Sequence, residues 1–347
     1  MKNGKRPYIP ETCVWELTLK CNMHCMHCGS SAGKRRAGEL GLEECLNVSD
    51  DLAGLGCRYA TLIGGEIFLY HGWERIARRL GRDGVLVNII TNGWLLGDEQ
   101  IDQIRYAELT NVGISLDGMA ENHNRIRGRR DSFRRVLKAF ERLEKAGIDV
   151  GVVTTLTDFN TADLRQMYDL LVAHGVACWQ IQIAAGMGSM RRNNALVLDP
   201  ARTAEITGFF REKSFSADLI MMAGDDIGYF DENEIHLRNH PGNRGEWHGC
   251  QAGLSVVGID SVGNVRGCGS LYDEKFIEGN VRDEPLEKIW LRDNGFAYNR
   301  RFDISLLQGK CADCDKAQLC RGGCRAVNYF STGSTFHNRY CSRRMSP

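Results

Sequence analysis

Three cysteines, Cys21, Cys25 and Cys28, lie within eight residues in the stretch CNMHCMHC. This spacing places three thiols in one loop, and thiolates are preferred ligands of zinc and of iron-sulfur clusters. A structural zinc site and a fully ligated four-iron cluster each use four protein ligands. A local set of three therefore implies either a distant fourth ligand or an open coordination position, and the chemistry of the chain depends on which of the two applies.

A second group of cysteines lies near the C-terminus, where residues 248–347 hold seven of the fourteen in the chain. In a reducing compartment, such clustering usually indicates metal binding rather than disulfides. The spacing Cys-x2-Cys-x5-Cys-x3-Cys that ends at Cys324 suits either zinc or an iron-sulfur cluster, and both alternatives stay open at this point. The remaining cysteines, which are Cys13, Cys45, Cys57 and Cys178, are expected to be small buried apolar residues. For Cys178 the alternative is that it lines a lumen, because it shares a strand face with Gln180 and Gln182.

Strands and helices alternate from residue 13 to residue 185, and these elements must position the first cysteines. Six short stretches rich in apolar and β-branched residues predict strands, with amphipathic helices between them, which is typical of a parallel sheet. The sequence therefore predicts an α/β fold, a partial (β/α)6 parallel barrel. Parallel barrels carry their chemistry on loops after the C-terminal strand ends, and the three-cysteine loop directly follows the first predicted strand.

Three parts are predicted along the chain: a barrel at residues 1–200, a turn-rich linker at 201–247 and a small cysteine-rich domain at 248–347. The linker contains the irregular stretch GDDIGYFDENEIHLRNHPGNRG. Asp225 and Asp226 within it are candidate proton acceptors for an oxidative reaction, although paired aspartates in a linker commonly only form turns. The sequence identifies no other catalytic residue.

Charge and hydropathy exclude several kinds of partner. The 44 basic and 44 acidic residues balance, so the net charge gives no reason to expect binding to nucleic acid or to an anionic membrane. The basic N-terminus is followed by no apolar signal region, and no apolar run is long enough to cross a bilayer. We therefore expect a cytoplasmic protein.

The stretch CNMHCMHC resembles the cluster-binding loop of the radical S-adenosylmethionine (radical SAM) enzymes. The resemblance implies that Cys21, Cys25 and Cys28 hold three irons of a four-iron four-sulfur cluster. In that family the fourth iron is left for the amino and carboxylate groups of S-adenosylmethionine. The cofactor then supplies the radical chemistry.

Further motifs on successive strand ends are similar to those of the same family. GGEI stands where the family has a Gly-Gly-Glu-Pro loop, with Ile67 in place of proline, and implies that Glu66 binds the methionyl amine. HNRIRG resembles a His-Asp-x-x-Arg-Gly turn and implies that Arg127 pairs with the methionine carboxylate, although Asn124 replaces the aspartate. Gln182 belongs to a face of the sixth strand expected to line the cofactor lumen. The implied cofactor-binding residues are Gly64, Gly65, Glu66, Thr91, Asn92, Ser115, Asp117, Arg127 and Gln182.

The C-terminal cysteines resemble the SPASM extension, which follows many radical SAM barrels and holds two auxiliary four-iron clusters. The resemblance implies Cys250, Cys268 and Cys324 as ligands of the first auxiliary cluster. Some family members have an eighth cysteine shortly after the first, but CQAGLSVVGID offers none. A non-cysteine residue, a spare cysteine or the substrate would complete this cluster. The implied ligands of the second auxiliary cluster are Cys311, Cys314, Cys320 and Cys341.

The resemblance implies an oxidoreductase that uses three four-iron clusters, S-adenosylmethionine and an external reductant of the flavodoxin or ferredoxin type. The 5′-deoxyadenosyl radical would abstract hydrogen from a substrate, and a ribosomally made peptide or protein is the leading class. Only about a dozen residues precede the first strand, so a separate leader-binding protein would capture such a peptide. The alternative is a dehydrogenase or epimerase acting on a sugar, aminocyclitol or tetrapyrrole. A non-catalytic zinc or iron-sulfur scaffold is a third hypothesis.

Overall fold

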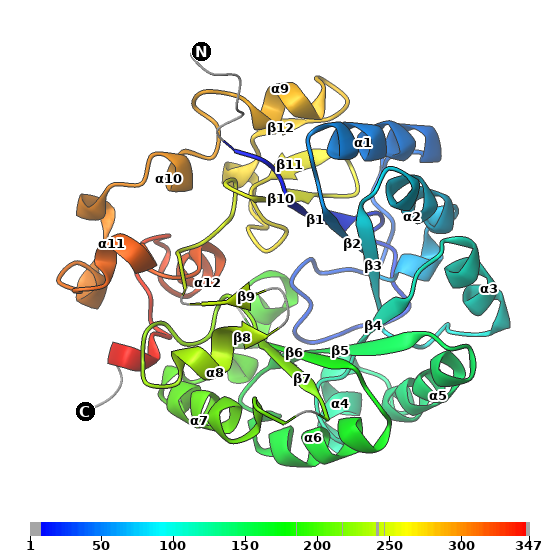
Figure 1. Cartoon of the computed structure of the whole chain (residues 1–347), viewed down its shortest axis with the longest axis horizontal. Helices are drawn as coiled ribbons and strands as arrows, with labels where there is room; N and C mark the ends of the chain where they lie inside the picture. Colours follow the sequence, from blue (N-terminus) through cyan, green and yellow to red (C-terminus); the bar gives the residue numbers. More distant parts are fainter. Residues whose placement is uncertain (1–7, 185, 217, 241–242, 246, 345–347) are drawn as a thin grey trace.

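A ten-stranded, mostly parallel sheet forms the centre of the computed structural model, which describes residues 8–184, 186–216, 218–240, 243–245 and 247–344. The strand order is β12-β11-β10-β1-β2-β3-β4-β5-β6-β7. Every neighbouring pair from β10 to β7 is parallel, whereas β11 and β12 pair antiparallel. The sheet is curved like a barrel (Figure 1). Within the described residues its two end strands, β7 and β12, do not pair with each other, so the barrel stays open.

The six predicted strands are all present and follow one another in the sheet. Their bounds are Thr12–Glu16 (β1), Tyr59–Ile63 (β2), Leu86–Thr91 (β3), Asn111–Ser115 (β4), Asp149–Leu156 (β5) and Cys178–Ile183 (β6). The prediction of an α/β partial barrel with a parallel sheet is therefore confirmed.

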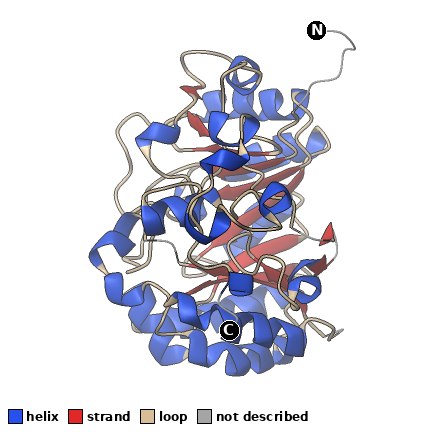
Figure 2. Cartoon of the chain, turned by 90° about the vertical axis from the view of Figure 1, so that its left-hand side faces the viewer, coloured by secondary structure: helices blue, strands red, loops and turns tan. Residues whose placement is uncertain are grey.

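Helices form the outer layer of the barrel (Figure 2). Side chains on a strand alternate between two faces, and on β6 Trp179, Ile181 and Ile183 are buried in the main core. Trp179 meets the ring of Phe209 on α7, with centroids 5.9 Å apart, so this face points toward the helices. The helices of this layer are Leu42–Gly54 (α1), Trp73–Arg82 (α2), Asp98–Tyr106 (α3), Ala120–Arg127 (α4), Ser132–Lys145 (α5), Leu164–Ala173 (α6) and Thr203–Lys213 (α7).

The segment predicted as a turn-rich linker, residues 201–247, is largely regular, and that prediction is wrong in this respect. It contains α7, strand β7 (Ile220–Ala223), helix α8 (Glu234–Arg238) and the short pair β8 (Asn239–His240) and β9 (Asn243–Arg244). β7 pairs parallel with β6 and so extends the barrel. Asp225 and Asp226 consequently stand directly after a barrel strand. The domain limits at residues 200 and 248 stay a prediction.

The C-terminal part of the chain also joins the barrel sheet. Strand β10 (Val256–Ile259) pairs parallel with β1, and Thr12 lies opposite Val256. β11 (Asn264–Arg266) and β12 (Gly279–Asn280) continue the sheet beyond it. The helices of this part are Leu286–Trp290 (α9), Ala297–Arg300 (α10), Ala317–Cys320 (α11) and Arg325–Thr332 (α12).

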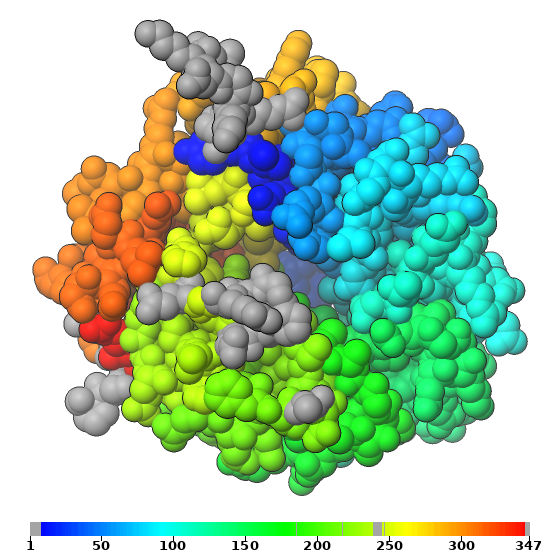
Figure 3. Space-filling model, in the orientation of Figure 1, coloured from blue at the N-terminus to red at the C-terminus, as the bar shows by residue number. Residues whose placement is uncertain are grey.

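A second, smaller core surrounds the C-terminal cysteines and includes Tyr229, Trp247 and Leu271. The space-filling view shows this face of the molecule hollowed at its centre, between the blue N-terminal part and the yellow and green parts (Figure 3). Among the described residues, none of the helices has the length and apolar character needed to span a bilayer.

Candidate active site

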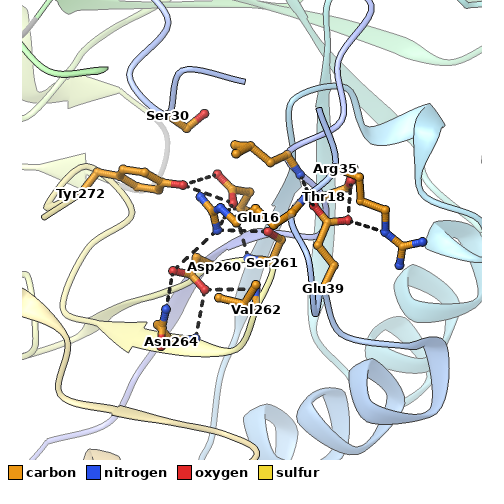
Figure 4. A network of polar contacts seen from close by, with 12 residues as sticks. Glu16, Thr18, Ser30, Arg35, Glu39, Asp260, Ser261, Val262, Asn264 and Tyr272 are labelled. Carbon is orange, nitrogen blue, oxygen red and sulfur yellow. Dashed lines mark hydrogen bonds and ion pairs between the residues drawn. The ribbon is translucent and has the colours of Figure 1, made fainter. Parts of the chain in front are cut away.

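The loop that follows β1 carries the first three cysteines and is fixed by one buried carboxylate, Glu39. Its oxygens accept hydrogen bonds from Thr18 Oγ1 at 2.8 Å and from Leu19 N at 2.7 Å. They also accept from Arg35 Nε at 3.0 Å and from Arg36 N at 3.1 Å (Figure 4). Glu39 thereby joins the two ends of the loop and holds its path across the barrel mouth. It belongs to no motif, so the sequence interpretation missed it.

The three thiols of this loop lie close to one another and to the barrel wall. Cys21 Sγ lies 3.2 Å from Gly65 O, and Arg127 Nη1 lies 3.8 Å from Cys25 Sγ. Burial, with smaller contributions from the nearby Cys25 and Cys28, raises the pKa of Cys21 to about 12. Three mutually close thiols with no fourth cysteine in the loop fit a four-iron cluster whose fourth iron binds a second molecule.

Two glycines allow the loop after β2 to touch the cysteine loop. A Cβ added at Gly65 would lie 2.5 Å from Lys20 O, and one at Gly64 would lie 2.8 Å from Thr18 O. The close approach permits hydrogen bonds from Gly65 N to Thr18 O at 2.7 Å and from Glu66 N to Lys20 O at 2.9 Å. A side chain at either position would push the two loops apart.

Substituting alanine for Gly65 is therefore expected to disturb the cysteine loop itself. We expect Gly65→Ala to cost about 1–3 kcal/mol of stability through overpacking and to lower both bound iron and affinity for S-adenosylmethionine. The control is Gly81→Ala in α2, where a Cβ meets nothing within 4 Å. That change should stabilise the protein by about 0.5–1 kcal/mol, because glycine is a poor helix former, and should leave iron content unchanged. Equal iron loss in both variants would contradict the role of Gly65.

Glu66 links the ends of β2 and β3. It is buried, and it accepts hydrogen bonds from Thr91 Oγ1 at 2.6 Å and from Asn92 N at 2.9 Å. Asn92 Nδ2 in turn donates to Asn22 Oδ1 in the cysteine loop at 2.7 Å. Burial raises the pKa of Glu66, and the hydrogen bond from Thr91 partly opposes this. The structure thus brings Glu66 of the GGEI motif together with Thr91 and Asn92, and binding of the methionyl amine by Glu66 stays a prediction.

Asp117 lies two residues after the end of β4, the strand next to β3, and is the charged centre of this part of the barrel wall. Its Oδ2 lies 2.6 Å from Arg127 Nε and 2.8 Å from His27 Nε2, and its Oδ1 accepts from Thr155 N at 2.9 Å. Although burial alone would raise the pKa of Asp117, the Arg127 and His27 charges hold it well below its usual range. Burial would lower the pKa of Arg127, but Asp117 and Cys25 together outweigh this effect and raise it.

The observed partner of Arg127 is therefore Asp117, with Cys25 beside it, and its predicted pairing with a methionine carboxylate stays a prediction. His27 lies between two of the cysteines, and the sequence interpretation assigned it no role. Because His27 and Arg127 both contact Asp117, the cysteine loop and α4 are held together by charge.

The remaining predicted cofactor residues lie on the same inner wall. Ser115 ends β4, and Gln182 on β6 donates from Nε2 to Thr155 Oγ1 at 3.2 Å. Since Thr155 N also binds Asp117, these side chains form one polar surface inside the barrel.

A buried charged network connects the cysteine loop with the C-terminal part of the chain (Figure 4). Arg36 Nη1 lies 3.1 Å from Glu16 Oε1 at the end of β1 and 3.8 Å from Asp260 after β10. Tyr272 OH donates to Glu16 Oε2 at 3.3 Å, and Arg266 Nη1 lies 2.7 Å from Asp260. Burial raises the pKa of Glu16, and Arg36 only partly opposes this. The network fixes the C-terminal part beside the cysteine loop.

Four of the C-terminal cysteines surround one small cavity of about 20 Å³. Among the described residues, no three His, Cys, Asp or Glu side chains converge closely enough to hold a single metal ion. Thiols that line a cavity, rather than meeting at a point, suit a cluster in which each cysteine binds a different iron. The four cysteines are Cys311, Cys314, Cys320 and Cys341.

The other three C-terminal cysteines form a separate set. Burial raises the pKa of Cys268, and the nearby Cys250 raises it further. Cys324 immediately precedes α12, and its backbone N donates to Tyr229 OH at 3.1 Å. Cys250 and Cys268 are also the nearby thiols that act on Cys324, so these three cysteines lie near one another. The assignment of the two sets to two auxiliary clusters stays a prediction.

Comparison with known proteins agrees with this geometry. The model of the radical SAM superfamily matches residues 15–171, and that of the SPASM iron-sulfur cluster-binding domain matches residues 250–324. An AdoMet-dependent heme synthase from Methanosarcina barkeri is 30% identical over 96% of this chain and 97% of its own length. The chain belongs to the radical SAM superfamily.

Other radical SAM proteins are similar over most of the chain. Mycofactocin maturase MftC from Mycolicibacterium smegmatis is 30% identical over 93% of this chain and 80% of its own length. The crystal structure of Streptococcus suis SuiB bound to S-adenosylmethionine matches with a TM-score of 0.76. The match covers 96% of this chain and 78% of SuiB. Because the two sequences are only 15% identical, the match shows a shared fold alone.

This radical SAM protein is accordingly an enzyme that uses four-iron clusters and S-adenosylmethionine. When bound, the cofactor supplies radical chemistry. The inner wall of the barrel carries buried polar side chains, among them Glu66 and Asp117. Gly64 and Gly65 let the backbone of the loop after β2 come close to the cysteine loop.

Proposed function

We propose that this radical SAM/SPASM oxidoreductase modifies a ribosomally made peptide or protein. In the proposed assignment Cys21, Cys25 and Cys28 hold the cluster that binds S-adenosylmethionine, and the two C-terminal cysteine sets hold the auxiliary clusters. Glu66, Asp117 and their neighbours form the S-adenosylmethionine pocket. The bound radical abstracts a hydrogen atom from the substrate, and an external one-electron reductant supplies the cluster.

One cavity carries the proposal. It has a volume of about 790 Å³ and lies between the loop after β6 and helix α12. Ser189 N in that loop donates to Cys28 O at 2.9 Å, and a Cβ at Gly188 would lie 2.4 Å from the same oxygen. Helix α12 begins directly after Cys324. The cavity wall therefore includes residues of the segment that contacts the first cysteine loop and of the helix that follows Cys324, and we place the substrate there.

The chemistry of the cavity wall suits a peptide. Arg191 and Arg339 contribute guanidinium groups that pair with carboxylates, and Tyr329 and Phe330 contribute aromatic surface. Arg191 lies over the Phe330 ring, 5.5 Å from its centroid, so the charge and the aromatic surface adjoin. The volume exceeds that of one amino acid and leaves room for several residues.

The relatives add support for the peptide class. MftC is named a maturase, and one solved SuiB structure contains its precursor peptide SuiA. In this proposal a separate leader-binding protein delivers the peptide.

A tetrapyrrole is the second candidate substrate. Two similar proteins from Methanosarcina barkeri are named AdoMet-dependent heme synthase and Fe-coproporphyrin III synthase, and this chain spans 97% of the first. The same aromatic and guanidinium groups would receive a planar ring with carboxylate side chains.

One pair of assays separates the two candidates. The enzyme is co-expressed anaerobically with each short open reading frame of its genomic neighbourhood, and the peptides are weighed by mass spectrometry. In parallel the reduced enzyme is incubated with S-adenosylmethionine and Fe-coproporphyrin III. We expect a mass change in a peptide and none in the porphyrin. Conversion of the porphyrin with every peptide unchanged would overturn the proposal in favour of the second candidate.

Blocking the cavity provides a direct test of its role. Ser331 lines it, and Ser331→Trp should fill part of the volume and lower substrate modification by about tenfold or more. Cleavage of S-adenosylmethionine without substrate should stay within about twofold, because the pocket for the cofactor is not touched. The control is Ser305→Trp on the exposed surface, which should change neither rate. Equal modification by both variants would exclude this cavity as the substrate site.

A further inference from the structure

The first auxiliary set has three thiols and no fourth cysteine beside it in the described part of the chain. Cys13 packs in the main core with Cys57, on the face of β1 opposite Val14. The residue of β1 that faces Gly269, the neighbour of Cys268, is Val14 and not Cys13. A Cβ added at Gly269 would lie 3.3 Å from Val14 Cγ1. Cys45 Sγ lies 3.2 Å from Tyr70 OH, beneath α1.

The last spare cysteine, Cys178, lies at the start of β6. A Cβ added at Gly151 would lie 3.0 Å from Cys178 Sγ. Both residues lie near the N-terminal ends of their strands, whereas the cysteine loop lies at the C-terminal ends. No spare cysteine therefore completes the first auxiliary set.

Asp226 presents an unused oxygen near this set. The residue follows β7 closely and is only 9% exposed. Its Oδ2 accepts a hydrogen bond from Ile183 N at 2.9 Å, which fixes the carboxyl group against the end of β6. Its Oδ1 is buried and has no hydrogen-bond partner among the residues that the structure describes. A buried carboxylate oxygen without a donor is costly, and a bound ion is one of the few arrangements that compensates for it.

A short chain of contacts joins Asp225, the neighbour of Asp226 in the chain, to Cys324. Tyr229 OH donates to the backbone oxygen of Asp225 at 2.6 Å and accepts from Cys324 N at 3.1 Å. Tyr229 is buried in the small core that also contains Cys250 and packs against Cys268. One tyrosine thus holds the segment of Asp225 and Asp226 against the residue that precedes α12.

The charges agree with this proximity. Burial raises the pKa of the Cys324 thiol, and the neighbouring charges that raise it further are, in order of strength, those of Cys250, Asp226 and Cys268. Asp226 therefore lies within electrostatic range of Cys324.

We propose that Asp226 Oδ1 is the fourth protein ligand of the first auxiliary cluster and completes the set of Cys250, Cys268 and Cys324. The inference rests on the proposed assignment of these three cysteines and not on the identity of the substrate. Asp226 then replaces the eighth cysteine that the sequence lacks. An oxygen ligand at one corner also gives this cluster a reduction potential different from that of the four-cysteine cluster.

The test uses the full chain carrying Cys21→Ala, Cys25→Ala and Cys28→Ala, so that only the auxiliary clusters remain. A four-iron cluster with an unligated corner readily loses that iron on mild oxidation and becomes a three-iron cluster, which electron paramagnetic resonance detects. After ferricyanide treatment, this background protein should give no three-iron signal. Adding Asp226→Ala should produce the signal and release about one iron per chain.

Two further variants keep the result interpretable. Asp226→Cys restores a thiolate and should abolish the three-iron signal, which separates ligand loss from misfolding. Asp225→Ala removes the adjacent carboxylate and should behave like the background protein. The proposal is overturned if the background already gives the full signal, if Asp226→Ala does not produce it, or if Asp225→Ala produces it instead. These readouts do not involve catalysis, so a failed substrate assay would leave them unchanged.

Discussion

Cleavage of S-adenosylmethionine should fall to background when Cys21, Cys25 and Cys28 are all replaced by alanine. The three thiols lie together in one loop, and the variant removes every cysteine ligand that this loop offers. The auxiliary sets lie in another part of the chain, so the purified protein should lose only about a third of its iron. Anaerobic iron determination and chromatographic detection of 5′-deoxyadenosine measure the two effects.

The matched control for this variant is Cys45→Ala. Cys45 is fully buried in α1 and contacts Tyr70, away from every proposed cluster. The Cys45→Ala protein should keep its full iron content and its ability to cleave S-adenosylmethionine. Cleavage that persists in the triple variant would refute the assigned role of the loop, and iron loss in Cys45→Ala would show that iron content is not specific to the proposed ligands.

Asp117→Asn should destabilise the protein by about 3–5 kcal/mol, because it leaves the buried Arg127 guanidinium without its counter-ion. Asp117 is completely buried, so solvent does not screen the lost attraction. His27 loses the same partner, and the cysteine loop should lose rigidity with it. Guanidinium denaturation followed by circular dichroism, under anaerobic conditions, measures the change in free energy of unfolding.

An exposed ion pair provides the comparison. Glu212 pairs with Arg165 on the surface, where both side chains are largely accessible to solvent. Glu212→Gln should therefore change stability by less than about 0.5 kcal/mol. If the two substitutions shift the denaturation midpoint equally, the pair of Asp117 and Arg127 is not the buried anchor described above.

The parts of the fold that follow from local pattern could be predicted from the sequence. Strands β1 to β6 and the cysteine loop each have their signal within a short stretch of residues, as in the alternation of buried and half-buried residues along β6. β7 and β10 were missed because each is only four residues long, and parallel pairing with β6 or β1 depends on distant parts of the chain.

In the candidate site, too, local motifs could be predicted from the sequence and tertiary contacts could not. The motifs named the groups that are predicted to line the cofactor pocket, but they did not show how these groups contact one another. Arg127 is engaged by Asp117, and the positions of Glu39 and His27 follow from tertiary contacts across the barrel mouth. The unused oxygen of Asp226 was equally invisible, since neither its burial nor its missing donor is encoded in any spacing.

The pairing of β1 with β10 also constrains how the chain assembles. Thr12 begins the first strand and Val256 begins its partner, so this contact closes a loop that spans most of the protein. Contacts of such sequence separation form late and slow folding. During synthesis, one edge of β1 therefore stays unpaired until residues 256–259 have left the ribosome. An unpaired edge is open to association with other chains, so truncation before β10 should yield an aggregating fragment.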